Sequence, residues 1–136
     1  MTRKSTRSWR AVIRVLLDTQ VLILAHLGSL PSRVQQVLAP VEVEVNLSAA
    51  SISEIAIKNA IGKLEMSEEE TKNAIRELRI TLLPFESHHA FGLFSLPMHH
   101  RDPFDRMILA TALAEKLPIV TGDRVFRRYP DVKVIW

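Results

Sequence analysis

Cysteine is absent from this 136-residue chain, and aromatic residues make up only 6% of it. Without cysteine there are no disulfides, thiolate zinc sites, iron–sulfur clusters or cysteine nucleophiles. Any metal must therefore be held by carboxylates, histidine or water. With two Trp and one Tyr, the sequence offers little from which to build an aromatic platform for stacked bases. The lack of cysteine also suits a reducing compartment, and we expect a cytoplasmic protein.

Long apolar segments are missing too. The longest uncharged run, residues 19–32, is interrupted by Gln20, His26, Gly28 and Pro31. A membrane-spanning helix needs about 20 predominantly apolar residues, so we expect no association with a membrane.

Positive charge is scarce outside the first residues. The chain carries 18 basic and 15 acidic residues, and five of the basic ones precede residue 15 with no acid among them. Without those five, 13 basic residues face 15 acidic ones. We therefore expect a basic, disordered leader over residues 1–10, able to attract phosphate groups, and one domain over residues 11–136.

Short β-branched runs alternate with longer amphipathic ones along that domain. This alternation predicts an α/β fold with a central, mainly parallel sheet of five strands. The expected strands are residues 11–17, 43–49, 80–83, 119–121 and 132–136. The expected helices are residues 32–39, 51–61, 67–78, 87–95 and 103–116.

Four acidic residues stand where the chain leaves a predicted strand or enters a predicted helix. Asp18 and Asp123 directly follow strands, whereas Glu54 and Asp105 lie in the first turns of helices. Because parallel strands end at the same edge of a sheet, all four can converge there. Four carboxylates so close together repel one another unless a divalent cation binds, and oxygen ligands alone favour Mg²⁺ or Mn²⁺. Such a site suits the cleavage of phosphodiesters.

Two of these acids also have an ordinary structural explanation at a helix start. Asp18 could cap a helix beginning near Gln20. Ser51 and Glu54 have the Ser-x-x-Glu form of a capping box, in which the glutamate bonds back to the cap amide. The same form recurs at Ser67–Glu70, where we expect only a cap.

The other two acids have structural explanations as well. Asp102 and Pro103 are typical of a helix start, and Asp105 then falls at the third helical position, near the positive end of the helix dipole. Asp123 follows Gly122 and could be a simple turn residue.

Taken in order, four segments resemble the PIN-domain ribonucleases, and within them the VapC-like toxins of toxin–antitoxin pairs. The resemblance runs from about residue 14 to residue 136 and departs from the family in its basic leader. Its segments are Leu16-Leu17-Asp18-Thr19, Ser51 through Lys58 with Gly62-Lys63-Leu64, His100 through Arg106, and Val120-Thr121-Gly122-Asp123.

This resemblance implies a three-layer α/β/α fold and an endoribonuclease that depends on Mg²⁺ or Mn²⁺. It implies a homodimer that is inhibited by a small VapB-like antitoxin, whose tail enters the active site. In this interpretation Asp18 and Asp105 ligate the metal directly, and Glu54 and Asp123 bind it through water or position the attacking water. Thr121 would orient a carboxylate, whereas we favour a capping role for Asp102.

Two alternatives stay open from the sequence. One is a PIN-domain nuclease that processes RNA without acting as a toxin. The other is a phosphoacceptor receiver domain, which also places acids after parallel strands; however, it needs a lysine after a late strand, and Lys133 lies inside the last one.

Histidines and arginines near the acids are weaker candidates. We expect His99 and His100 to be loop residues, His88 and His89 to lie on an exposed helix face, and Trp136 to be a packing residue. Five arginines could contact RNA phosphates or simply be solvated. They are Arg101, Arg106, Arg124, Arg127 and Arg128.

Overall fold

The computed structural model describes residues 13–136. The leader expected over residues 1–10 lies outside the described residues and stays a prediction. Within the described residues, no helix has both the length and the apolar character needed to cross a bilayer.

A five-stranded sheet forms the centre of the fold, and each of its four strand pairs is parallel. The spatial order is β3-β2-β1-β4-β5. This confirms the predicted α/β fold and sharpens "mainly parallel" to wholly parallel among the described residues. The strands are β1 (Ile13–Leu17), β2 (Val43–Ser48), β3 (Thr81–Leu83), β4 (Ile119–Val120) and β5 (Val134–Ile135).

Alternating side chains of β1 build two separate cores. Val15 and Leu17 belong to one buried cluster, and Leu16 between them belongs to the other. Since successive side chains of a strand point to opposite faces, both faces of this strand are covered, as a parallel sheet requires.

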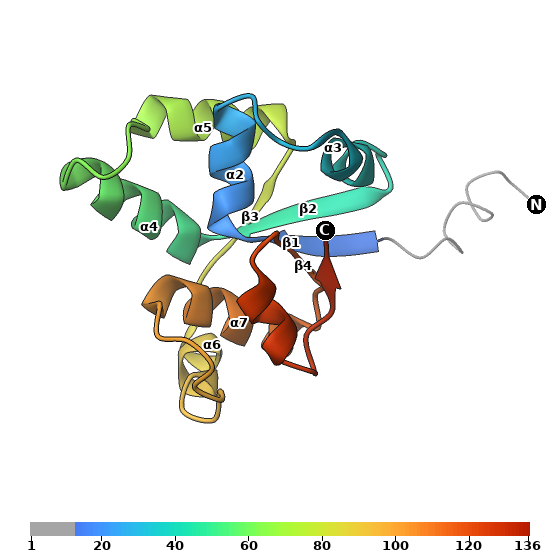
Figure 1. Cartoon of the computed structure of the whole chain (residues 1–136), viewed down its shortest axis with the longest axis vertical. Helices are drawn as coiled ribbons and strands as arrows, with labels where there is room; N and C mark the ends of the chain where they lie inside the picture. Colours follow the sequence, from blue (N-terminus) through green and yellow to red (C-terminus); the bar gives the residue numbers. More distant parts are fainter. Residues whose placement is uncertain (1–12) are drawn as a thin grey trace, which may run out of the picture.

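Helices cover the two faces of the sheet in unequal sets. The first cluster includes residues of α2 (Thr19–His26), α3 (Ser32–Leu38), α4 (Ala49–Ala60) and α5 (Glu68–Glu77). The second includes residues of α7 (Pro103–Glu115) and of the 3₁₀ helix η1 (Arg124–Arg128), and α6 (Ser87–Gly92) packs against α7. In Figure 1 these sets lie above and below the strands, which confirms the predicted three layers.

Helix α4 begins earlier than the sequence suggests. The N-cap is Ser48, the last residue of β2, whose hydroxyl accepts a hydrogen bond from the Ala50 amide at 3.0 Å. The predicted capping box of Ser51 and Glu54 is therefore wrong, because both residues already lie inside the helix. By contrast, the box of Ser67 and Glu70 is confirmed at the start of α5.

Helix α6 corrects two further predictions. It ends at Gly92 rather than at residue 95. His89 is only 2% exposed, not on an open face. Its Nδ1 accepts the backbone N–H of Glu86, and its Nε2 lies 2.8 Å from Glu115 on α7. With Nδ1 accepting, Nε2 carries the proton and donates to Glu115, so the imidazole joins α6 to α7 and has no lone pair left for a metal.

Candidate metal centre

All four acidic residues singled out in the sequence line one cleft of about 230 Å³. The cleft lies past the carboxyl ends of β1 and β4, where the sequence order of neighbouring strands changes direction. Ligand sites of open parallel sheets form at such a position. The lining residues are Asp18, Gln20, Val21, Leu24, Glu54, Lys58, Asp102, Asp105, Gly122, Asp123 and Trp136.

Asp18 is held at the end of β1 by its neighbour strand. Its amide donates to the Val120 carbonyl at 3.0 Å, and its Oδ2 accepts the Thr121 hydroxyl at 2.8 Å. Asp18 occupies the N-cap position of α2 but makes no side-chain cap hydrogen bond. The carboxylate lines the cleft, and the backbone amide of Gln20 at the start of α2 also favours its charged form.

Thr121 links two of the acids. Its hydroxyl donates to Asp18 and accepts the Asp123 amide at 3.0 Å. Both hydrogen bonds have ordinary lengths and the threonine is buried, so its hydroxyl is fixed in place. This geometry agrees with the orienting role that the family resemblance implies for Thr121.

Glu54 reaches the cleft from the second turn of α4. Its side chain is 7% exposed, and its Oε2 lies 2.6 Å from the Nζ of Lys58. The other oxygen, Oε1, is buried without a hydrogen-bond partner. Ser51 does not bond to Glu54; its hydroxyl accepts that of Thr19 at 2.8 Å and so ties α4 to the start of α2.

Asp105 and Asp102 share the first turn of α7. The Oδ1 of Asp102 accepts the Asp105 amide at 2.9 Å, which confirms Asp102 as the cap. The Asp105 carboxylate is left for the cleft, and His100 Nε2 stands 3.5 Å from its Oδ2. His100 is fixed by the Tyr129 hydroxyl, 2.9 Å from its Nδ1, so this loop histidine braces the wall beside Asp105.

Asp123 is the most exposed of the four. Its Oδ1 accepts the Val125 amide at 3.0 Å and caps η1. The turn interpretation is therefore correct for one oxygen, while the residue still lines the cleft.

Crowding of buried carboxylates changes their acidity. Burial raises the pKa of Asp18 to about 6, and Glu54 and Asp123 add to this against the Thr121 hydrogen bond. Burial also raises the pKa of Asp105 to about 8, helped first by the charge on Asp18. At neutral pH the metal-free cleft therefore favours a proton on Asp105, first because burial penalises its charge and then because neighbouring acids repel it.

A family comparison gives this cleft its context. Residues 15–132 match the model of the PIN domain. The chain belongs to the PIN-domain family. Comparison with curated protein sequences finds no match.

Solved structures share the fold of this PIN domain. VapBC2 from Rickettsia felis, bound to a promoter DNA fragment, matches with a TM-score of 0.69 and 18% identity over 90% of this chain and 98% of that one. A toxin–antitoxin complex from Klebsiella pneumoniae matches at 0.63 and 20%, over 90% and 96% of the two chains. FitAcB from Neisseria gonorrhoeae matches at 0.61 and 23%, over the same shares. At these identities the likeness shows the fold alone.

The side chains of the cleft fit the divalent cation that PIN domains generally bind. The donors are carboxylate oxygens, which suit a hard cation such as Mg²⁺ or Mn²⁺. Glu54 Oε1 is buried without a hydrogen-bond partner, so it is open to a cation, although Lys58 pairs with the other oxygen of the carboxylate. Asp18, Glu54, Asp105 and Asp123 are the residues that could hold the ion.

The sequence did not predict that Lys58 and Trp136 line the cleft. Lys58 is the one cationic side chain among the residues that line the cleft, and its spacing of four from Glu54 was the available signal. Trp136 packs on Gly122, where a Cβ atom would come within 2.7 Å of the indole ring. Trp136 is thus a packing residue, as predicted, and Gly122 is needed for the close approach. No local pattern predicts that the residue after β5 contacts the turn after β4.

Arg106 differs from the other four arginines. It is buried, and its guanidinium donates to the carbonyls of Pro97 at 2.9 Å and Leu96 at 3.1 Å. Both roles predicted for Arg106, contact with RNA phosphates and solvation at the surface, are therefore wrong. Its guanidinium instead fixes the loop before α7. The remaining four are exposed, and their contact with RNA stays a prediction.

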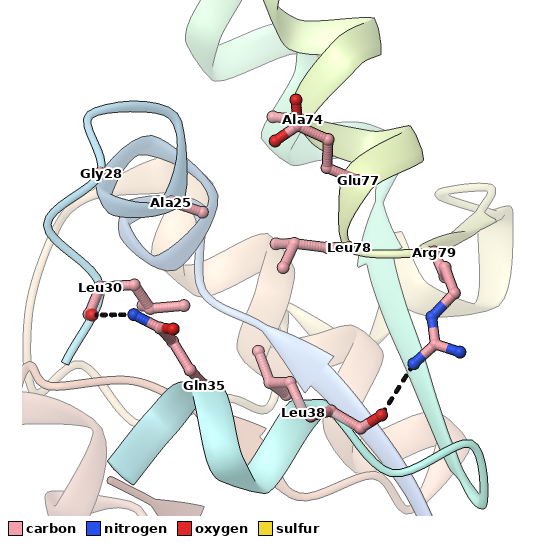
Figure 2. A pocket seen from close by; sticks show the side chains of 10 residues that line it. Ala25, Gly28, Leu30, Gln35, Leu38, Ala74, Glu77, Leu78 and Arg79 are labelled. Carbon is pink, nitrogen blue, oxygen red and sulfur yellow. Dashed lines mark hydrogen bonds between the residues drawn. The ribbon is translucent and has the colours of Figure 1, made fainter. Parts of the chain in front are cut away.

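A second, larger hollow of about 430 Å³ lies between α2, α3 and the end of α5 (Figure 2). Leu30, Leu38 and Leu78 give it apolar walls. Gln35 donates to the Leu30 carbonyl and Arg79 to the Ala39 carbonyl, each at 2.8 Å. It holds no cluster of carboxylates, so size alone does not mark the centre of the chemistry.

Proposed function

We propose that this PIN domain is an endoribonuclease that depends on Mg²⁺ or Mn²⁺ and acts as the toxin of a toxin–antitoxin pair in the cytoplasm. The observation that carries the proposal is the meeting of Asp18, Glu54, Asp105 and Asp123 in one cleft, with the pKa of Asp18 and of Asp105 raised. The toxin role, an antitoxin partner and a homodimer are supported by the fold shared with proteins of toxin–antitoxin complexes.

In the proposed reaction, water attacks the phosphorus atom in line and the bond to the 3′ oxygen breaks. The products are a 5′-phosphate and a 3′-hydroxyl. When bound, a divalent cation supplies a nucleophilic water at neutral pH and neutralises charge that grows on the phosphate.

The side chains of the cleft divide the remaining work. Asp18 and Asp105 would hold the cation, with Thr121 fixing the orientation of Asp18 through its hydroxyl. Glu54 and Asp123 would orient the attacking water and accept its proton, since their carboxylates line the same cleft. None of these residues needs to form a covalent intermediate.

Cleavage of RNA with Mg²⁺ or Mn²⁺, with and without EDTA, tests the enzyme directly. We expect cleavage that EDTA abolishes and that Asp18→Asn lowers by about 100-fold or more. The matched control is Asp131→Asn, which removes an exposed acid outside the cleft. Metal-independent cleavage, or full activity of Asp18→Asn, would reject the proposal.

Growth on induced expression tests the toxin role separately. We expect wild-type protein to arrest a bacterial host and Asp18→Asn to leave growth normal. If the purified protein cleaves RNA but its expression never slows growth, the nuclease stands and the toxin role is wrong.

A further inference from the structure

Lys58 places a positive charge inside the carboxylate cleft. It lies one helical turn after Glu54 on α4, and its Nζ donates to Glu54 Oε2 at 2.6 Å. It is the one cationic side chain among the residues that line the cleft. The ammonium therefore sits at an oxygen that a divalent cation would otherwise use.

Acidic groups other than Glu54 also stabilise the positive charge of Lys58. The hydrogen bond to Glu54 raises the pKa of the ammonium, and the charge on Asp102 acts in the same direction, as does that on Asp105 once this carboxyl is ionised. Asp102 and Asp105 belong to the start of α7, so acidic groups of two helices act on the charge of the lysine. Its role in the cleft is thus larger than that of an ordinary helix pair.

A second pair in the same chain shows what an ordinary pair looks like. Lys72 stands four residues after Glu68 on α5, with Nζ 2.7 Å from the carboxylate. That glutamate side chain is 81% exposed, against 7% for Glu54. Spacing and distance match, and Glu69 also acts on the charge of Lys72, but the burial of the glutamate differs, which makes Lys72 the natural control.

Glu54 has its two oxygens in different states. Oε2 is neutralised by Lys58, while Oε1 is buried without a partner. A cation that approaches this carboxylate gains Oε1 freely but must share or displace the ammonium at Oε2. Like charges at such range repel, so the lysine opposes the binding of a cation.

We propose that Lys58 is a resident counter-ion that competes with the divalent cation for Glu54 and so lowers the metal affinity of the cleft. This inference rests on the proposed metal-dependent function. Lys58 is a positioning residue here, because it acts on the metal through Glu54. Its effect on metal affinity can be measured in the protein without RNA.

Titration of the full-length protein with Mn²⁺ alone, followed by electron paramagnetic resonance of the free ion, tests this proposal. We expect Lys58→Gln to bind Mn²⁺ about tenfold more tightly than wild type, because one positive charge near the ion is removed. Lys58→Arg keeps the charge and Lys72→Gln removes a charge of the same kind elsewhere, so both should stay within about twofold of wild type.

The outcomes separate the counter-ion role of Lys58 from the proposed metal-dependent function. Equal or weaker Mn²⁺ binding by Lys58→Gln overturns the counter-ion role, as does an equal gain in Lys72→Gln. Lys58→Met provides a second neutral variant if Lys58→Gln does not fold, which circular dichroism would show. If the folded wild-type protein and all folded variants fail to bind Mn²⁺, the proposed function fails as well, whereas equal binding by all of them rejects only the role of Lys58.

Discussion

Helices α4 and α5 carry the same Ser-x-x-Glu pattern and use it in opposite ways. In α5 the pattern closes a capping box, with Glu70 accepting the Ser67 amide at 2.9 Å and Ser67 accepting the Glu70 amide at 3.1 Å. In α4 the cap is Ser48, so Ser51 and Glu54 lie inside the helix and turn toward buried neighbours. Figure 1 shows where each helix sits relative to the strands.

The two helices begin in different surroundings, and this accounts for the different roles of Glu54 and Glu70. Helix α4 leaves the carboxyl end of a buried strand directly, since β2 ends at Ser48 and α4 begins at Ala49. Helix α5 begins in a surface connection, where Ser67 and Glu70 are exposed. Glu54, on the helix that continues a buried strand, lines the cleft, whereas Glu70, at a helix start on the surface, serves only its own helix.

Exchanging the two glutamates for glutamine gives the largest expected difference. Glu54→Gln should lower RNA cleavage at saturating Mn²⁺ by about 100-fold or more, because it removes a charge from the proposed reaction centre. Glu70→Gln should leave cleavage within about twofold of wild type, since it changes a solvated helix start. Similar losses in both variants would show that the contrast between the helices has no bearing on function.

The raised pKa values of the cleft predict the next largest effect, a dependence of Mn²⁺ affinity on pH. Because burial raises the pKa of Asp105 to about 8 and that of Asp18 to about 6, a cation must displace protons below those values. Mn²⁺ affinity should therefore weaken as pH falls, by up to about tenfold per unit below pH 8 and more steeply below pH 6. Affinity that stays constant between pH 9 and pH 6 would contradict this, with calorimetric titration as the measurement.

The same pKa shift predicts how the metal-free fold responds to pH. The carboxyl of Asp105 has a folded pKa of about 8, above the ordinary value of 3.8, so between these values the folded protein binds more protons than the unfolded one. Its contribution to stability is present below pH 3.8, falls as pH rises, and levels off above pH 8.

Glu70 has the opposite sign at the start of α5. Its backbone hydrogen bond with Ser67 lowers the pKa of the Glu70 carboxyl below 4.5. Its contribution to stability is therefore present above pH 4.5 and is lost as the pH falls through the lowered pKa.

Because the pKa of Asp105 is raised to about 8, urea unfolding in EDTA should show wild type losing stability from pH 6 to pH 8. Asp105→Asn should lose less, and an equal loss in the two proteins would contradict the assignment.

Loss of the two caps gives the smallest effect. Ser48→Ala and Ser67→Ala should each lower the free energy of unfolding by about 1 kcal/mol, because each removes an acceptor from a helix N-terminus. Ser53→Ala, at an exposed position within α4, should change it by less than about 0.5 kcal/mol. Chemical denaturation measures all three, and a Ser48→Ala protein as stable as wild type would refute the observed cap.

Patterns along the sequence were sufficient for the sheet and for the meeting of the acids. The apolar run that ends at Asp18 predicts a buried parallel strand, and parallel strands place Asp18 and Asp123 at one edge whatever the details of the helices. Local sequence patterns are therefore enough to predict the position of those site residues that depends only on the direction of the strands.

Features that depend on contacts between distant elements were not predictable in this way. Ser48 and Ser51 are both suitable caps, and only the end of β2 decides between them. His89 is buried because Glu115 on α7 faces it, 26 residues away. Trp136 enters the cleft through the relative placement of β4 and β5, which no local pattern specifies, whereas the spacing of Lys58 from Glu54 was a local signal.

A crystal structure of the protein grown with Mn²⁺, with the ion located by anomalous scattering, tests the central claim most directly. We expect a peak in the cleft within about 2.0–2.4 Å of carboxylate oxygens of both Asp18 and Asp105. An empty cleft in a protein saturated with Mn²⁺, or an ion bound only elsewhere on the surface, would contradict the account.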